Sequence, residues 1–332
     1  MLFRERVTTM TPTKPLQDLM SEHFPEQAWV VDRLIAASSI TMLSGAPASY
    51  KTYAALEMAL AVAGGKQFLG QFDTEPGAVM VVDQENGERL LQQMLKQLHA
   101  DADLPIHFYS SQGFVLNNLY VDHKLAECEE NDVKLLIIDS YVRVRIGDEN
   151  SPSDTAEAFK FLKRFANNGV AVLVIHHNRK PGANGFTGGY GNEMRGSSDL
   201  LAAPDSHLAL VRNDYKLTFH QTKQRYAREL APFEVWVEAN DDNLKFQYVG
   251  TIKKVDKELV IKEGVKSLLR EHGQMLQREI LEKLPEVGVK TNEHKLQPLL
   301  PAMKLDGDIT DIPGSGNGTY WLLVHNVDKE DS

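Results

Sequence analysis

Short apolar runs alternate with longer amphipathic stretches between residues 39 and 175. The short runs predict buried strands, and the longer stretches, whose apolar residues recur every three or four positions, predict helices. This alternation is typical of an α/β protein with a mainly parallel central sheet. The predicted strands are 40–43, 78–82, 106–109, 133–138 and 170–175, and the predicted helices are 52–63, 88–99, 121–130 and 155–167.

The pattern changes after residue 203, where four apolar runs separated by turn residues predict antiparallel strands. Beyond a lysine-rich joint, three predicted helices precede two short strands, which is the outline of a winged helix-turn-helix. Pro298 and Pro301 fall in the third helix and are expected to break or shorten it. The predicted strands are 207–211, 216–221, 233–237, 244–249 and 319–324, and the predicted helices are 258–271, 276–284 and one that starts near 292.

These changes of pattern divide the chain into four predicted parts. The first part is expected to be an arm that packs on a neighbouring subunit or stays disordered. The parts are an N-terminal arm at 1–28, an α/β core at 29–250, a winged-helix-like module at 251–326 and an acidic tail at 327–332.

Composition narrows the class of protein. The 332 residues are 42% hydrophobic and 25% charged, which suits a globular protein of about two domains. No apolar run approaches the roughly 18 residues of a membrane span, the N-terminus lacks the pattern of a secretory signal, and Cys128 is the only cysteine. We therefore expect a cytoplasmic protein without a membrane segment. The net charge of −10 argues against coating nucleic acid with the whole surface, but it is compatible with a local basic channel.

The strongest chemical signal is the segment GAPASYKT, between the first predicted strand and the first predicted helix. It matches the phosphate-binding loop, Gly-x-x-x-x-Gly-Lys-Ser/Thr, except that Tyr50 replaces the second glycine. In such a loop, backbone amides and a helix N-terminus bind phosphates, the lysine reaches the β and γ oxygens, and the hydroxyl ligates Mg²⁺. The alternatives are a chance Lys-Thr pair at a strand–helix junction and a decayed nucleotide site. The candidate nucleotide-binding residues are Gly45, Ala46, Pro47, Ala48, Ser49, Tyr50, Lys51 and Thr52.

Further candidates follow the ends of three predicted strands. Asp139 ends the run 133–138, where a carboxylate can hold the hydration shell of Mg²⁺. Glu85 follows the second strand and can orient and deprotonate an attacking water, or it can belong to a helix N-cap box. His176 and His177 end the last parallel strand and point to opposite faces, so that one can sense a γ-phosphate while the other is simply exposed.

Basic and aromatic residues later in the chain indicate contacts with nucleic acid or with a neighbouring subunit. The glycine-rich segment 181–197 suits stacking on a single strand of nucleic acid, although an ordinary surface loop fits as well. Lys223 and Arg225 lie two apart at a strand end, from which they reach a neighbour's γ-phosphate or form a solvated basic end. The candidate DNA-binding residues in and before the glycine-rich segment are Arg179, Lys180, Phe186 and Tyr190.

Taken in order, these motifs resemble the RecA-type ATPase core of RepA-like hexameric replicative helicases, which plasmids and phages encode. The resemblance runs from Trp29 to about Arg225. The matching pieces are WVVDRLIAASSITMLSGAPASYKT, VVDQEN, LLIIDSYVRV with the following DEN, VLVIHH, MRGSSDL and TKQR. Tyr50 stands where the family pattern has glycine.

The resemblance also implies a role for each candidate residue. At the nucleotide, it implies that Lys51 and Thr52 bind the nucleotide and Mg²⁺, that Asp139 binds Mg²⁺, and that Glu85 is the catalytic base. It implies His176 or His177 as the sensor, Arg195 near the subunit boundary, and Lys223 and Arg225 as a finger pair acting in trans. It also implies that Arg143 faces the central DNA channel. For Arg143 the alternative is a solvated loop.

The expected function is therefore ATP hydrolysis with Mg²⁺, coupled to movement on DNA by a hexameric ring helicase of a plasmid or phage. Single-stranded DNA and further copies of the chain are the expected partners. Two other classes stay open: a RadA-like recombination or repair ATPase, and an ATP-gated DNA-binding regulator.

The C-terminal module is expected to act differently from the core. It carries eleven basic and eleven acidic residues, and its third helix contains no arginine that could bind a guanine edge. We therefore expect weak or no specific duplex binding, and instead either docking of a protein, such as a replication partner, or positioning of the ring. Trp321 and the turn at 287–289 are the candidate docking residues, although both could belong to the core.

Overall fold

The computed structural model describes residues 13–111, 113–178, 199–252, 257–313 and 318–324. The chain forms two compact units, Met1–Ile252 and Lys253–Ser332, each of which is described by itself. The division falls in the predicted lysine-rich joint.

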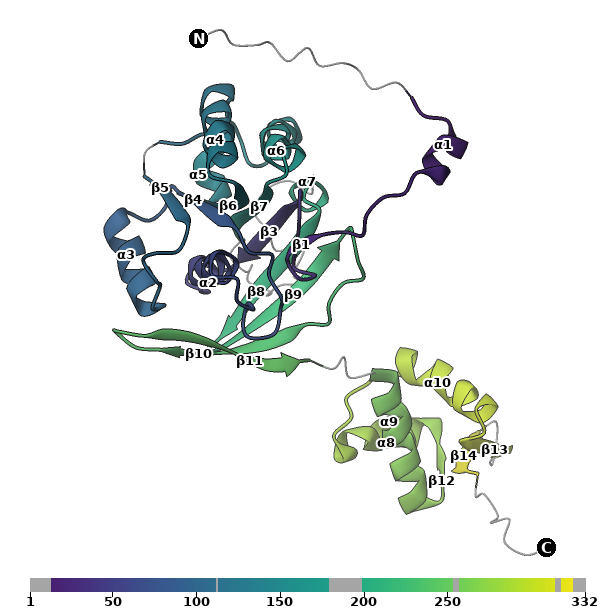
Figure 1. Cartoon of the computed structure of the whole chain (residues 1–332). Coiled ribbons are helices and arrows are strands. Elements are labelled where there is room, and N and C mark those ends of the chain that lie inside the picture. Colours follow the sequence, from purple (N-terminus) through teal and green to yellow (C-terminus); the bar gives the residue numbers. More distant parts are fainter. Residues whose placement is uncertain (1–12, 112, 179–198, 253–256, 314–317, 325–332) are drawn as a thin grey trace, which may run out of the picture. The chain divides into compact units, whose positions relative to one another are not determined.

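The first unit is built on a nine-stranded sheet with the order β11-β10-β9-β8-β3-β7-β6-β4-β5 (Figure 1). Six neighbouring strands, from β8 to β5, run parallel, and the other three extend the sheet antiparallel. The strands are β3 (Ile40–Gly45), β4 (Ala78–Asp83), β5 (Ile106–Ser110), β6 (Val133–Asp139), β7 (Ala171–His177), β8 (Ser206–Asn213), β9 (Lys216–Gln224), β10 (Phe233–Ala239) and β11 (Leu244–Thr251).

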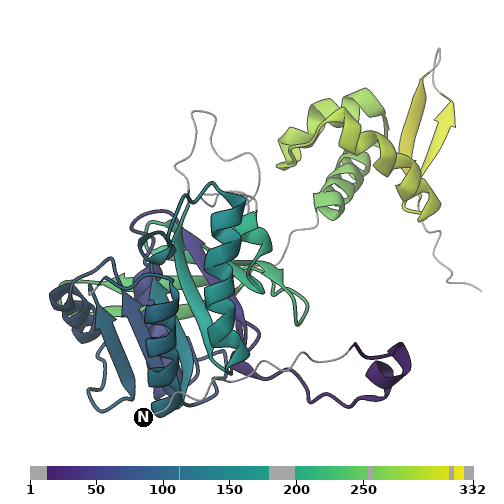
Figure 2. The same ribbon diagram turned by 90° about the horizontal axis from the view of Figure 1, so that it is seen from above.

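Helices cover both faces of the parallel part of the sheet. The helix α2 (Lys51–Ala63) lies on one face, and α4 (Asn118–Glu130) and α6 (Pro152–Asn167) lie on the other (Figures 1 and 2). Successive residues of a strand point to opposite faces, so Val81 packs in the core under α2 and Val82 packs in the core under α4 and α6. Burial on both faces explains why these strands are almost continuously aliphatic.

The antiparallel strands continue only the core that lies under α2. An aromatic cluster fills this side, and the rings of Phe219 and Phe233 stack with their centroids 4.9 Å apart. The prediction that the strand at 207–211 is antiparallel is only half right, because β8 pairs parallel with β3 and antiparallel with β9. The chain leaves β7 at the carboxyl end of the sheet and enters β8 at the amino end, which makes β8 parallel to β3.

Several short elements were not predicted, because each offers too few residues for a periodic pattern. In the arm, α1 (Leu16–Ser21) contains no buried residue. The others in this unit are β1 (Trp29–Val31), β2 (Ile35–Ala36), α5 (Tyr141–Val144) and α7 (Asp199–Ala202), whereas the helix α3 (Glu88–Gln97) was predicted and starts at the expected residue.

The second unit packs helices around a three-stranded antiparallel sheet with the order β12-β14-β13. Trp321 and Val289, which were candidates for docking, are buried in the core of this unit, so the core alternative is the correct one for them. The elements are α8 (Lys257–His272), β12 (Gln274–Leu276), α9 (Gln277–Lys283), the 3₁₀ turn η1 (Leu284–Val287), α10 (Glu293–Leu305), β13 (Ile309–Pro313) and β14 (Thr319–Leu323).

The expectation that prolines would break the third helix is wrong. Pro298 and Pro301 both lie inside α10, which has 13 residues. Each proline removes one backbone hydrogen bond, but both are exposed, so water can bind the carbonyls that lose a partner. The opposite face of the helix is anchored in the core by Leu296, Leu299, Leu300 and Met303.

None of the helices in the described part of the chain is both long enough and apolar enough to cross a membrane.

Candidate nucleotide-binding site

The candidate site lies where the carboxyl ends of β3, β4, β6 and β7 meet at one edge of the sheet. A cavity of about 290 Å³ opens there between the loop before α2 and the ends of these strands. Its walls include Lys51, Thr52, Glu85, Asp139 and His177, so the fold brings together candidates that are up to 126 residues apart in the sequence (177 − 51). Such a position outside the carboxyl ends of parallel strands is where open α/β sheets bind ligands.

Gly45 begins the loop and has no room for a side chain. A Cβ atom there would lie 2.6 Å from the carbonyl oxygen of Leu210 in β8 and 2.7 Å from the Ser49 hydroxyl. The loop therefore turns directly against the neighbouring strand.

Tyr50 occupies a left-handed backbone conformation, with φ 61° and ψ 22°, immediately before the first residue of α2. Glycine adopts this conformation freely, whereas a residue with a side chain is strained by about 1–3 kcal/mol. The ring packs edge-on against Tyr53, with 5.9 Å between centroids, and the guanidinium of Arg212 lies 4.4 Å from its centre. Although Tyr50 departs from the sequence pattern, its backbone has the left-handed conformation that glycine adopts freely.

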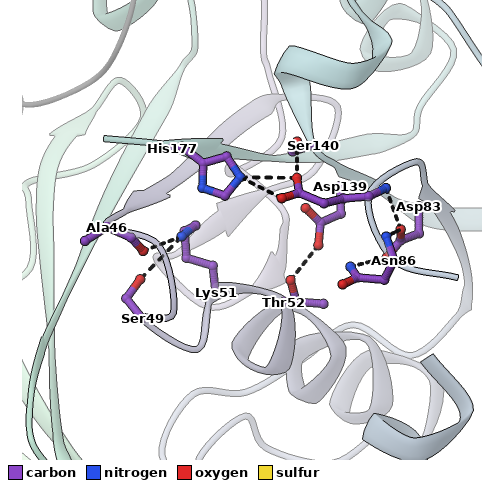
Figure 3. Close-up of polar contacts among 10 residues, drawn as sticks. Ala46, Ser49, Lys51, Thr52, Asp83, Asn86, Asp139, Ser140 and His177 are labelled. Carbon is purple, nitrogen blue, oxygen red and sulfur yellow. Dashed lines mark hydrogen bonds and ion pairs between the residues drawn. The ribbon is translucent and has the colours of Figure 1, made fainter. Parts of the chain in front are cut away.

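Lys51 is buried at the bottom of the loop. Its Nζ donates a hydrogen bond to the Ala46 carbonyl at 2.6 Å and a longer one to the Ser49 hydroxyl at 3.4 Å (Figure 3). Burial lowers its pKa to about 8, although Asp139 and Glu85 act in the opposite direction. A buried ammonium with only these weak acceptors is suited to binding phosphate oxygens.

Thr52 and Asp139 place two oxygens together beside the lysine. The Thr52 hydroxyl donates to Oδ2 of Asp139 at 2.6 Å (Figure 3), and burial raises the pKa of this carboxyl to about 7. A hydroxyl and a desolvated carboxylate are hard oxygen donors of the kind that Mg²⁺ prefers, and a cation would offset the cost of burying the carboxylate. This donor pair fits a magnesium ion that accompanies a nucleotide.

Glu85 points into the same site from the turn after β4. Its carboxylate accepts a hydrogen bond from the Ser140 hydroxyl at 2.6 Å and lies 3.1 Å from Nε2 of His177. The hydrogen bond with His177, followed by those of Ser140 and the charge of Arg143, lowers the Glu85 pKa to about 2 against the effect of burial. Because α3 starts at Glu88, Glu85 does not lie in the first turn of that helix.

Asp83 shapes the turn that carries Glu85. This buried residue accepts hydrogen bonds from the backbone amides of Glu85, at 2.9 Å, and Asn86, at 2.6 Å, and from the Asn86 side chain (Figure 3). Asp83 therefore closes a turn ahead of α3, whereas the N-cap position of that helix is Gly87 and has no side-chain cap, so the N-cap box is not formed.

The two histidines at the end of β7 have different surroundings. His177 faces Glu85 in the cavity, whereas His176 is buried, with its ring edge-on to Tyr141 at 5.6 Å. They point to opposite faces, as expected for neighbours on a strand, and His177 is the one placed to contact a bound phosphate.

Lys223 and Arg225 lie at the other end of the sheet. Lys223 pairs in register with His207 near the amino end of β8, and His207 pairs with Met42 of β3, which lies three residues or about 10 Å along the strand from Gly45. Its Nζ donates to the carbonyls of Leu201 and Ala202, and Arg225, just past β9, forms a 3.0 Å ion pair with Asp205. Neither side chain is near the phosphate loop of its own chain.

Other candidates lie outside the cavity or outside the described residues. Arg143 is exposed on the single turn of α5, close enough for its charge to act on Glu85. The candidates Arg179, Lys180, Phe186, Tyr190 and Arg195 lie outside the described residues.

Arg212 and Ser140 are site residues that the sequence reasoning missed. Arg212 lies near the end of β8, one residue past the predicted run 207–211, where a basic residue before a turn carries no motif. Ser140 follows Asp139 directly, and a hydroxyl beside a strand-end carboxylate was the only signal that could have drawn attention to it.

Comparison with known proteins agrees with this geometry. Residues 6–183, more than half of the chain, match the family described as AAA domain. A search of curated proteins gave no match. The matched segment contains the phosphate loop, Asp139 and the parallel strands β3 to β7, whereas β8 lies beyond it. The chain belongs to the AAA domain family of P-loop ATPases.

Proposed function

We propose that this ATPase is a DNA motor, most consistent with a hexameric replicative helicase of a plasmid or phage. The observation that carries the proposal is the division of the catalytic groups between two ends of the sheet. The cavity holds a phosphate loop, an acid pair and an ionised Glu85, while the basic pair Lys223 and Arg225 lies too far away to serve its own loop. A subunit interface brings such a pair to the nucleotide of a neighbour.

The residues of the cavity divide the chemistry among them. Lys51 and the backbone amides of the loop bind the β- and γ-phosphates. Thr52 and Asp139 hold Mg²⁺, which supplies charge neutralisation at the phosphates when it is bound. Removing the cation should therefore leave Asp139 as an uncompensated buried acid.

Glu85 holds the attacking water in line with the γ-phosphate. With a pKa of about 2, it stays ionised at neutral pH, and Ser140 and His177 fix its carboxylate. A carboxylate with so low a pKa is a weak base, so positioning of the water dominates over early proton removal. His177, which lies between Glu85 and the loop, responds to the presence of the γ-phosphate.

Single-stranded DNA is the proposed second substrate. The support is the exposed Arg143 near Glu85, which places a cation next to the group that positions water. Contact with a DNA phosphate at Arg143 would alter the electrostatics of Glu85 and so link DNA binding to turnover.

Steady-state ATP turnover with and without single-stranded DNA tests this function first. We expect stimulation by DNA, followed by strand displacement on forked duplexes in the presence of ATP. Stimulation without displacement would favour a RadA-like recombination or repair ATPase. Turnover that DNA does not change would contradict the motor and favour an ATP-gated regulator.

We further propose that the second unit is a winged-helix domain that docks a replication partner protein and does not read duplex DNA. Three of its lysines are already paired with acids: Lys262 with Asp306 at 2.8 Å, Lys266 with Asp308 at 3.0 Å, and Lys304 on α10 with Asp311. Leu305, at the end of α10, is 88% exposed and is a better docking candidate than the buried Trp321.

Expression of residues 252–332 alone tests the docking role, because this unit has its own hydrophobic core. We expect no sequence-selective binding to duplex DNA at near-physiological salt. Selective binding tighter than about 10⁻⁷ M would overturn the docking role, because non-specific affinity is weaker than this.

A further inference from the structure

The phosphate loop contains two residues with side chains in a conformation that favours glycine. Tyr50 has φ 61°, and Ala48, two residues earlier, has φ 58°. Residues held in this region persist only where surrounding groups fix them. The loop therefore needs support from outside its own sequence.

Arg212 contacts both of these residues. Its guanidinium carbon lies 4.4 Å from the centre of the Tyr50 ring, and its Nη1 donates to the Ala48 carbonyl at 2.9 Å. Its Nε donates to the Asp214 carbonyl at 3.0 Å, which fixes the arginine on the turn after β8. Arg212 forms no salt bridge with any residue that the structure describes, so its charge is directed to the ring and the two carbonyls.

We propose that Tyr50 and Arg212 form a clamp that holds the phosphate loop in its nucleotide-binding conformation. The C=O and N–H groups of a trans peptide point in opposite directions. Fixing the Ala48 carbonyl on Arg212 therefore also fixes the Ser49 amide on the side away from Arg212. The contact of Arg212 with the ring holds Tyr50, which forms the peptide bond with Lys51.

The clamp takes over the task that glycine performs in the usual loop pattern. Glycine reaches the left-handed conformation without strain, whereas tyrosine reaches it here with its ring held against Arg212 and Tyr53. Arg212 and Tyr50 are positioning residues, since they act on the nucleotide through the loop. The inference rests on the proposed nucleotide site at this loop.

A loop that leaves its binding conformation part of the time lowers the apparent affinity by the fraction of competent molecules. Loss of the clamp therefore raises Kd and KM for ATP, while kcat changes little, because the bound state still contains Glu85, Asp139 and Lys51 in place. This split between KM and kcat separates positioning of the loop from participation in the reaction.

A double-mutant cycle on the full chain tests the clamp, with Kd measured for a fluorescent ATP analogue and kcat and KM measured for ATP. We expect Arg212→Ala to raise Kd and KM about tenfold, with kcat changed by less than about twofold. In an Ala48→Gly/Tyr50→Gly background the same arginine change should have little further effect, because glycine reaches the left-handed conformation at both positions without support. Tyr50→Phe keeps the ring, so Arg212→Ala should raise Kd in this background as much as it does in the wild type.

Arg33→Ala is the matched control, since Arg33 also donates to a backbone carbonyl, that of Arg228, but does so away from the loop. Thermal melting of each variant checks that it is folded. Equal losses of affinity from Arg212→Ala in the wild-type and Ala48→Gly/Tyr50→Gly backgrounds would overturn the clamp, because Arg212 would then contact the nucleotide itself.

The outcomes also separate the clamp from the nucleotide site. Wild-type protein that binds nucleotide through Lys51, together with an Arg212→Ala variant of unchanged affinity, overturns the clamp alone. A wild-type protein that binds no nucleotide, or a Lys51→Ala variant that binds as well as the wild type, overturns the site and the clamp together.

Discussion

The two ends of the central sheet carry charged side chains in opposite situations. At the carboxyl end, Lys51, Asp139 and Glu85 converge on one cavity and are held at short distances by polar neighbours. At the amino end, Lys223 and Arg225 are occupied by backbone carbonyls and by Asp205.

Burial explains the difference. Lys51 and Asp139 are desolvated, so their pKa values move toward neutrality, to about 8 and about 7. A ligand of opposite charge beside each residue would stabilise its charged form again. Arg225 is more than half exposed and has its partner already. The carboxyl end is thus arranged for a ligand from solution, whereas the charges at the amino end already have partners within the chain.

Lys51→Ala should have the largest effect at the carboxyl end. Removal of the buried ammonium leaves the phosphates without their main cation, so we expect loss of nucleotide binding and of ATPase activity to background. Binding of a fluorescent ATP analogue and steady-state turnover measure both. Lys66→Ala, an exposed lysine just past the end of the same helix, is the control and should leave both unchanged. Binding that survives in Lys51→Ala would place the nucleotide elsewhere.

Arg225→Ala should act from the amino end with almost as large an effect. We expect kcat to fall by about 10³–10⁵-fold, the range for an arginine finger, while nucleotide affinity stays near that of the wild type. Mixing Arg225→Ala subunits with Lys51→Ala subunits should restore part of the activity. The first kind of subunit supplies an intact phosphate loop, and the second kind supplies the arginine. Arg228→Ala serves as control.

A wild-type protein that hydrolyses ATP at full rate as a strict monomer, or an Arg225→Ala variant that loses binding, would contradict action in trans. Sedimentation of the active species together with turnover distinguishes these cases.

Glu85→Gln should have a smaller effect that is confined to the chemical step. The amide keeps the size of the side chain but loses the charge that positions water, so we expect kcat to fall by about 10²–10⁴-fold with unchanged nucleotide binding. Single-turnover hydrolysis measures the step directly. The control is Glu88→Gln in the first turn of α3, and equal losses in both variants would exclude the assigned role.

The smallest expected effect is the pH dependence of nucleotide binding. The pKa of Lys51 is lowered to about 8 in the free protein, and a bound phosphate should raise it again, so binding takes up a proton. Affinity should then fall by up to about tenfold per unit as the pH rises above about 8, because the free lysine loses its charge there. Calorimetry in two buffers of different ionisation enthalpy measures the proton uptake, and affinity that does not change up to pH 9.5 would contradict it.

Much of the first unit could be predicted from the sequence because its strands are buried on both faces. Apolar runs predicted the five strands β3 to β7 to within one or two residues at their ends, although the edge strand β5 is largely exposed and only its neighbours are buried on both faces. Since parallel strands end at the same edge, the polar residues that follow them, Glu85, Asp139 and His177, could be expected to meet.

The direction of β8 and the path of α10 could not be predicted in the same way. An apolar run fits a parallel or an antiparallel neighbour equally well, and only the path of the chain between strands decides between them. The rule that proline breaks a helix holds for isolated helices, and the packing of α10 in the core overrides it at Pro298 and Pro301.

The sequence by itself determined the sheet, the phosphate loop and the chemical types at its edge, because these follow from local periodicity and from a motif of eight consecutive residues. Only the tertiary structure decided which histidine faces Glu85 and which residue supports Tyr50. The contacts of His177 with Glu85 and of Arg212 with Tyr50 join residues 92 and 162 positions apart (177 − 85 and 212 − 50), whose approach depends on strand order and register and not on any local pattern.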